Sequence, residues 1–125
     1  MTTFKKLSKY PTEREMWNRI KGALNHNDRR AYRVETVATP GFPDIVWITE
    51  KGVRLMELKA GKMRFRQAQI KFIKDAFSAG VNVWVIQQQV KLGLMTVLPG
   101  IEAIEGHSDG DGMHIEKWLE VMTNA

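Results

Sequence analysis

Apolar and polar positions alternate with different periods along the chain, and each period predicts an element. After Pro11, apolar residues recur at helical spacing, and Thr12 followed by Glu15 has the form of a capping box at a helix start. Further on, apolar runs of strand length are separated by glycine, proline or polar residues. The expected elements are a helix from 12 to about 25, strands at 31–38, 44–49 and 53–59, a helix at 66–79, strands at 81–87 and 92–98, and a helix at 115–122.

This order predicts an α/β fold in which helices flank a central mixed β-sheet, built on an αβββαβ core. The chain has 125 residues, of which 43% are hydrophobic and 26% charged, and this composition suits a single domain (1–125) with one core. The core is expected over about 11–98. The remainder, 99–125, is an acidic segment with a Gly- and Asp-rich loop at 99–113 before the last helix.

Several classes of protein are excluded by composition. No apolar run approaches the length of a membrane span, and the first six residues lack an apolar signal core, so no membrane association is expected. Cysteine is absent, which rules out disulfides, thiolate metal sites and cysteine nucleophiles. A reducing, cytoplasmic setting fits this absence.

Positive charge is concentrated in the body of the chain. Residues 1–100 carry 18 Lys and Arg against 8 Asp and Glu, whereas 101–125 carry one Lys against 6 acidic residues. A basic body favours a polyanionic partner such as nucleic acid. The alternative, a soluble protein that is simply basic, fits the charge about as well.

Two neighbouring strands carry the most informative chemistry. Asp44 opens one apolar strand, Glu57 and Lys59 end the next, and a short turn brings these ends together. Because side chains alternate across a strand, Glu57 and Lys59 project from one face, while Leu58 points the other way and leaves its carbonyl between them. Carboxylate and carbonyl oxygens suit Mg²⁺ or Mn²⁺. Lys59 could orient an attacking water or stabilise charge on a phosphorane.

Each of these residues also has a structural explanation. Asp44 could terminate a Gly-Phe-Pro turn, and a Glu-x-Lys pair is common on solvated strand faces. The flanking residues are nevertheless so apolar that both strands look central. Three ionisable groups at the ends of central strands need a reason.

Two helices supply further candidates. Glu13 shares a helical face with the apolar residues at 17, 20 and 24 and can reach inward, whereas Glu15 lies nearly opposite. Gln69 leads the apolar stripe of the second helix and needs a polar partner, for which the metal site is one candidate. Alternatively, Glu13 is a first-turn acid favoured by the helix dipole, and Gln69 bonds a nearby loop backbone.

A known family shares this set of motifs. The PD-(D/E)xK nuclease superfamily resembles the chain over about 11–88, and its VRR-NUC branch resembles it most. The resemblance is carried by Glu13, Gly-Phe-Pro-Asp at 41–44, Glu-Leu-Lys at 57–59, and Gln69 with Gly80 eleven residues later. The first helix is also similar to that of archaeal-type Holliday junction resolvases.

The resemblance implies a restriction-endonuclease-like domain and a metal-dependent endonuclease. Asp44, Glu57 and the Leu58 carbonyl would bind Mg²⁺ or Mn²⁺, with Glu13 as a further ligand or water contact. Lys59 would assist the nucleophile, and Gln69 would act as a positioning residue. Stand-alone members are similar to resolvases and small phage or plasmid nucleases, so DNA and a second copy of the chain are the implied partners.

Basic residues near these motifs are candidates for phosphate contacts. The first set lies between the Glu-x-Lys strand and the following helix, and comprises Lys62, Arg64 and Arg66. The footprint could extend to Lys5, Lys6, Lys9, Arg29, Arg30 and Arg33. Any one of them is more often a solvated charge than a contact. No helix-turn-helix or zinc finger is present, so recognition of DNA shape or branching is expected rather than base sequence.

The C-terminal segment gives a weaker signal. The residues of metal-ligand type there lack EF-hand or zinc spacing, which favours a polar loop; they are His107, Asp109, Asp111 and His114. The last helix is expected to pack on the body or on a second subunit through one apolar face, formed by Ile115, Trp118, Leu119 and Met122.

Three functions follow as hypotheses. The first is an endonuclease that hydrolyses DNA phosphodiester bonds and selects branched or junction structures. The second is a catalytically inactive nucleic-acid-binding module of the same fold, and the third is a basic protein whose partner is another protein. The intact set of Asp44, Glu57 and Lys59 favours the first, and salt-sensitive DNA binding would separate the third from the others.

Overall fold

Within the residues that the computed structural model describes (10–34, 40–106 and 112–124), six strands form one sheet in chain order. They are β1 (Arg30–Arg33), β2 (Ile45–Thr49), β3 (Gly52–Ala60), β4 (Val83–Gln88), β5 (Met95–Pro99) and β6 (Met113–His114). Strands β3 and β4 are parallel, and all other neighbours are antiparallel. The expected α/β class with a mixed sheet is therefore confirmed.

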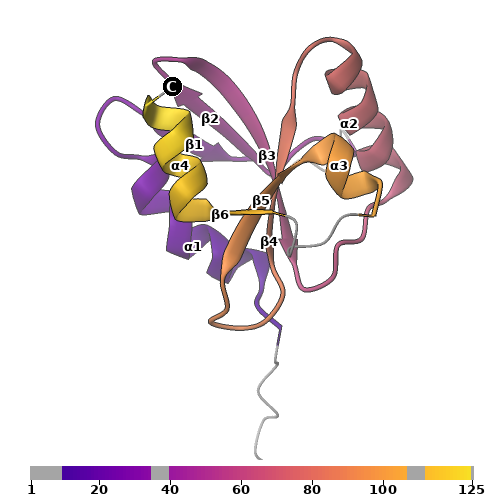
Figure 1. Ribbon diagram of the computed structural model, residues 1–125, viewed down its shortest axis with the longest axis horizontal. Coiled ribbons are helices and arrows are strands. Elements are labelled where there is room, and N and C mark those ends of the chain that lie inside the picture. The colour runs from indigo at the N-terminus through magenta and orange to yellow at the C-terminus, as the bar shows by residue number, and fades with distance from the viewer. Residues whose placement is uncertain (1–9, 35–39, 107–111, 125) are drawn as a thin grey trace, which may run out of the picture.

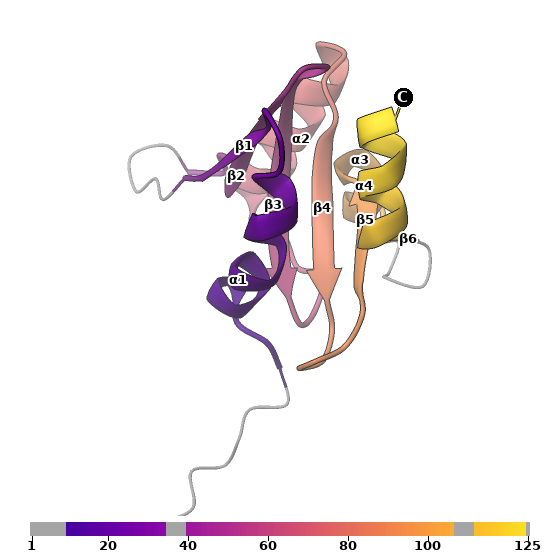
Figure 2. The same ribbon diagram turned by 90° about the vertical axis from the view of Figure 1, so that its left-hand side faces the viewer.

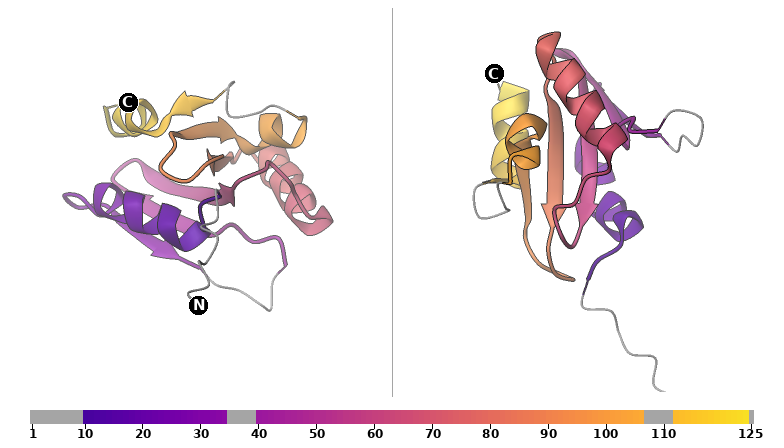
Figure 3. Two further views of the ribbon diagram at one scale, coloured as in Figure 1. Left: turned by 90° about the horizontal axis from the view of Figure 1, so that it is seen from below. Right: turned by 90° about the vertical axis from the view of Figure 1, so that its right-hand side faces the viewer.

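Four helices in the described part of the chain cover the two faces of this sheet (Figure 1). They are α1 (Glu13–Leu24), α2 (Gln67–Ser78), α3 (Gly100–Ile104) and α4 (Ile115–Asn124). Helices α1 and α4 lie on one side, in front of the sheet in Figure 2, and α2 and α3 lie on the other, in front of it in the right-hand view of Figure 3. None of the helices in the described ranges is long and apolar enough to cross a membrane.

The main hydrophobic core lies between the sheet and the α1/α4 layer. Trp47 of β2 is fully buried there, its indole N–H donates to the Leu24 carbonyl at 2.8 Å, and its ring centroid lies 5.7 Å from that of Trp118 in α4. The last helix thus packs on the body of the protein, as one of the two expected arrangements. Leu58 also faces this core and is fully buried, so the alternation along β3 turns Glu57 and Lys59 to the α2 side.

Most element boundaries agree with the sequence pattern. At the start of α1, Thr12 and Glu15 form the expected capping box through two hydrogen bonds of 3.1 Å. β1 ends at Arg33, and residues 35–38 of the expected strand lie outside the described residues. The fifth strand begins at Met95 rather than 92, because Leu92 has a positive φ of 61° that belongs to a turn.

The expectation of an uninterrupted loop at 99–113 was wrong. Helix α3 lies inside that range, and the two-residue strand β6 begins at its last residue. Both are too short to produce a periodic pattern in the sequence. They form because of tertiary contacts: Ala103 of α3 is buried against β4 and β5, and β6 pairs with Thr96 and Val97.

Gly41 fixes the distance between the start of β2 and the start of α2. Its φ is +86°, and a Cβ added there would lie 2.3 Å from the carbonyl oxygen of Ala68. The next residue, Phe42, packs edge-on against Phe72 of α2 with 5.4 Å between ring centroids. The segment before Asp44 is therefore pressed against the helix turn that carries Gln69.

We predict that Gly41→Ala destabilises the protein by more than about 2 kcal/mol, since the left-handed conformation and the overlap with Ala68 both oppose a side chain. Urea unfolding gives the free energy. Gly22→Ala is the matched control, because a Cβ there meets nothing within 4 Å, and alanine in a helix interior should stabilise by about 0.5–1 kcal/mol. A Gly41→Ala protein as stable as the original would contradict this packing.

Candidate active site

Asp44 and Glu57 lie opposite each other at one end of the β2–β3 hairpin. The antiparallel register pairs Ile45 with Met56, so the next pair outward is Asp44 and Glu57. The Asp44 Oδ2 atom accepts a hydrogen bond of 2.8 Å from the Leu58 N–H, which holds its carboxylate against β3. Glu57 is only 4% exposed. It is therefore not on a solvated strand face, and the structural explanation for the Glu-x-Lys pair does not apply.

Placing two carboxylates together is electrostatically costly. Burial, the repulsion of Asp44 and a hydrogen bond with the Asp44 carboxylate together raise the pKa of Glu57 to about 9, against the opposing effect of Lys59. At neutral pH the metal-free pair consequently holds a proton on Glu57. A second positive charge at this place would relieve the repulsion.

Gln69 links the two functional side chains of β3. Its Nε2 donates to Glu57 Oε1 at 3.0 Å, and its Oε1 accepts from Lys59 Nζ at 3.0 Å and from the Arg66 N–H at 2.9 Å. A glutamine is suited to this position because its amide both donates and accepts. The two explanations for Gln69 are both realised, since the side chain bonds the backbone at the start of α2 and also reaches the candidate site.

Lys59 is held beside the carboxylates with most of its side chain covered. Its amine lies 4.5 Å from the centroid of the Phe65 ring, a cation–π contact that adds to the Gln69 bond. Burial lowers the pKa of Lys59, and the charges of Glu57 and Asp44 oppose this. The amine is thus fixed in direction and available to a negatively charged group.

Glu13 reaches the same end of the sheet from α1. Burial and the charge of Asp44 raise its pKa, whereas Arg33 and Lys59 lower it, so it lies within electrostatic reach of the site. Arg33 is also its ion-pair partner at 3.8 Å. Glu15 instead completes the helix cap and lies 3.5 Å from Lys91. Glu15 therefore has the capping place expected of it, whereas the Glu13 side chain is 46% exposed and no more buried than that of Glu15 at 41%.

The donor set fits a hard divalent cation that keeps part of its water shell. Among the described residues no group of three or more His, Asp or Glu side chains is arranged to hold a metal. The candidate ligands are therefore the carboxylates of Asp44 and Glu57 and one backbone carbonyl. The N–H and C=O groups of a strand residue point the same way, so the Leu58 carbonyl points to the side on which its N–H binds Asp44, just beyond the first residue of β2. Mg²⁺ commonly binds through one or two carboxylates and several waters.

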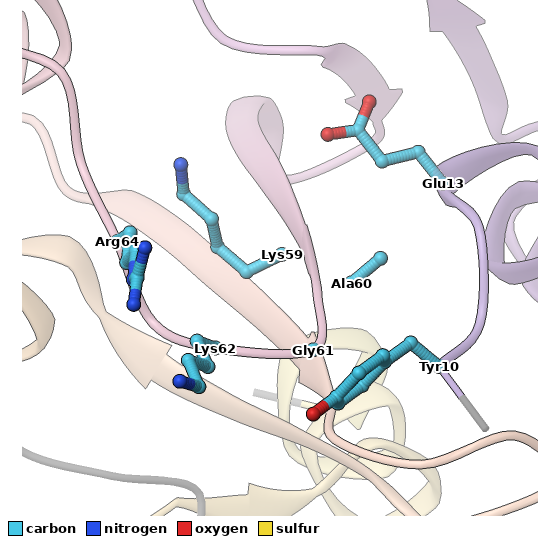
Figure 4. A pocket seen from close by; sticks show the side chains of 7 residues that line it. All are labelled: Tyr10, Glu13, Lys59, Ala60, Gly61, Lys62 and Arg64. Atoms are coloured by element: carbon cyan, nitrogen blue, oxygen red, sulfur yellow. The ribbon is translucent and has the colours of Figure 1, made fainter. Parts of the chain in front are cut away.

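Exposed cations lie beside this site. Lys62 and Arg64 are exposed and line a pocket of about 520 Å³ together with Lys59, Glu13, Tyr10, Ala60 and Gly61 (Figure 4). Arg66, also exposed, acts electrostatically on both Glu13 and Lys59. These positions are the ones expected of phosphate contacts.

The other candidates are not brought to the site, or cannot be placed. Arg29 is bonded to Glu50 at 3.0 Å, and Arg30 bonds to backbone carbonyls nearby, at the turn end of the hairpin. His114 is exposed on β6. The remaining expected residues lie outside the described ranges: Lys5, Lys6, Lys9, His107, Asp109 and Asp111.

Sequence reasoning missed two residues at this site. Tyr10 lines the pocket, and its one signal was an aromatic residue directly before the proline that precedes the first helix. Gln87 is 1% exposed, stands beside Lys59 in the β3–β4 register, and donates to the Gly61 carbonyl at 2.8 Å. Its signal was a run of glutamines closing an apolar strand, since a buried amide needs partners.

No protein-family model and no curated protein matches the chain. The likeness to PD-(D/E)xK nucleases therefore depends on the residues described above.

We predict that the metal-free protein loses stability as pH rises from about 5 to 8.5. The folded protein retains a proton on Glu57 up to a pKa of about 9, whereas an unfolded glutamate releases it near 4.5, so folding takes up a proton throughout this window. Glu57→Gln should flatten the dependence and raise Tm at pH 8 by at least about 3 °C. Thermal unfolding in EDTA measures both.

The exposed Glu105 provides the control, since Glu105→Gln removes a carboxylate outside the site and should leave the pH dependence unchanged. If Glu57→Gln were less stable than the original protein at pH 8, the account of a strained carboxylate pair would be wrong.

Proposed function

We propose that the protein is a divalent-metal-dependent DNA endonuclease of the PD-(D/E)xK type, selective for branched or otherwise structured DNA. The observation that carries this proposal is the link through Gln69, which joins Lys59 directly to Glu57, the residue that lies opposite Asp44. Residues far apart in the sequence thus meet at one end of the sheet in an arrangement suited to phosphodiester hydrolysis.

Each residue has a chemical task in this proposal. Asp44, Glu57 and the Leu58 carbonyl would hold Mg²⁺ or Mn²⁺, with Glu13 as a further ligand or water contact. The ion would lower the pKa of a coordinated water and offset charge on the phosphate. Lys59 stabilises the negative charge that grows on the phosphate oxygens, and its bond to Gln69 keeps the amine directed.

The surroundings support a polyanionic substrate. Lys62, Arg64 and Arg66 are exposed next to Lys59, and Arg33 stands beside Glu13. Phosphate contacts of this kind orient DNA without reading its sequence, which agrees with the proposed selection by shape. The expected homodimer stays a prediction, to be measured by light scattering on the purified chain.

The main alternative is an inactive nucleic-acid-binding module of the same fold. A binding protein gains nothing from Glu57. Burial next to Asp44 disfavours the charged form of this carboxyl group, and the charged form would repel phosphate. The same residues are useful where a cation must be held. A purely protein-binding role gives Lys62, Arg64 and Arg66, which lie beside Lys59, no polyanion to contact.

We predict that the protein cuts at least one labelled substrate among branched, flapped, nicked and linear DNA duplexes when Mg²⁺ or Mn²⁺ is present. Asp44→Ala and Lys59→Ala should each reduce cleavage by at least ~100-fold while DNA binding persists, because they remove groups that act on the reacting phosphate. Gln69→Leu should lower the cleavage rate by a similar order, since Lys59 loses its partner. Gel-resolved product formation gives the rates.

Two matched controls belong to this experiment. Lys71→Ala removes an exposed lysine of α2 that pairs with Asp75, and Gln67→Ala removes an exposed glutamine two residues before Gln69. Both should cleave like the original protein. If no substrate is cut with either metal but salt-sensitive DNA binding remains, the binding module is the correct function; if DNA binding is absent as well, a protein partner is.

A further inference from the structure

The pocket beside the candidate active site contains an aromatic ring that the proposed chemistry does not use. Tyr10 is 43% exposed and lines the pocket next to Gly61, with Lys62 and Arg64 across from it (Figure 4). The same pocket is lined by Lys59, so it is continuous with the place where a phosphate would be cut. What binds here would lie next to the reacting group.

The Tyr10 ring packs against a stretch of backbone that hydrogen bonds hold in place. A Cβ added at Gly61 would lie 3.4 Å from Cδ1 of Tyr10, so the ring packs directly against the glycine. The Gly61 N–H donates to the Gln88 carbonyl at 2.8 Å, and its own carbonyl accepts from the buried Gln87 side chain at 2.8 Å. The next residue in the chain, Pro11, is buried and restricts the backbone of Tyr10 to an extended conformation.

The size and chemistry of the pocket suit one nucleotide. Its volume of about 520 Å³ falls in the range of roughly 300–1,000 Å³ found for small-ligand sites. An aromatic platform flanked by cations is the arrangement by which proteins hold single-stranded nucleic acid, the base stacking on the ring and the phosphates meeting the charges. Glu13, at the far end of the pocket, would repel a phosphate and so favours placing it near Lys62 and Arg64.

We propose that Tyr10 is the stacking platform of a nucleobase subsite, which takes one unpaired DNA base adjacent to the scissile phosphate. A base inside an intact duplex is stacked on its neighbours and cannot reach the ring, whereas a base at a branch, overhang or frayed end can. The subsite makes DNA with an unpaired nucleotide the preferred ligand. Its place next to the cut rests on the proposed nuclease function, but stacking itself does not require cleavage.

A double-mutant cycle, which combines a substitution of Tyr10 with an abasic position in the DNA, tests the subsite. All proteins carry Asp44→Ala so that binding is measured without cleavage, and the probe is a labelled duplex with a single-stranded overhang in which successive overhang positions are made abasic. One abasic position should weaken binding about tenfold, the usual effect of losing one base–aromatic stack. Tyr10→Ala should weaken binding to the intact overhang equally, and the abasic change should then cost nothing more.

Three comparisons complete the test. Tyr10→Phe keeps the ring and should restore discrimination against the abasic probe. Tyr32→Ala removes an aromatic side chain that is 56% exposed on β1 and should bind like the parent protein. A blunt duplex should bind equally well with or without Tyr10.

The subsite is overturned if Tyr10→Ala and its parent respond equally to the abasic change, or if Tyr10→Ala weakens blunt and overhang DNA alike. Its failure is distinguishable from failure of the nuclease. Cleavage by the Asp44-containing protein without coupling between Tyr10 and a base would refute the subsite alone. Coupling without cleavage of any substrate would refute the nuclease and leave the subsite standing.

Discussion

Two carboxylates held side by side on paired strands are the constraint on which the rest of the site depends. Asp44 and Glu57 face each other across the hairpin, and Glu57 is buried, so charging both in the absence of a cation is unfavourable. A fold tolerates such a pair only when the surrounding contacts fix it in place. Instability at this point is the cost that the proposed cation site would carry while it is empty.

The supporting contacts come from outside the hairpin. The Leu58 N–H holds Asp44, and Gln69 holds Glu57 and Lys59 in one set of bonds. Gly41 brings the chain before Asp44 against the turn of α2 that carries Gln69, closely enough that a methyl group would not fit. Gly41 and Gln69 thus have the same effect, because each fixes α2 against the β2–β3 hairpin.

Much of this arrangement was predictable from sequence, for reasons that are local. Alternation placed Glu57 and Lys59 on one face, capping placed Thr12, and helical phase turned Gln69 inward. The contacts that depend on distant parts of the chain were not predictable. No sequence pattern predicts that the Gln69 amide reaches both Glu57 and Lys59, or that Tyr10 lies on Gly61. Nor does any pattern predict that the five residues from Gly100 form a helix against β4 and β5.

The central claim is that Asp44 and Glu57 together form a cation site, and binding of Mn²⁺ followed by isothermal titration calorimetry tests it most directly. The account predicts saturable binding to the original chain that is lost in Asp44→Asn and in Glu57→Gln, with Tm rising on Mn²⁺ addition in the original chain alone. Binding that survives both substitutions, or no binding to the original chain under conditions where it is folded, would contradict it.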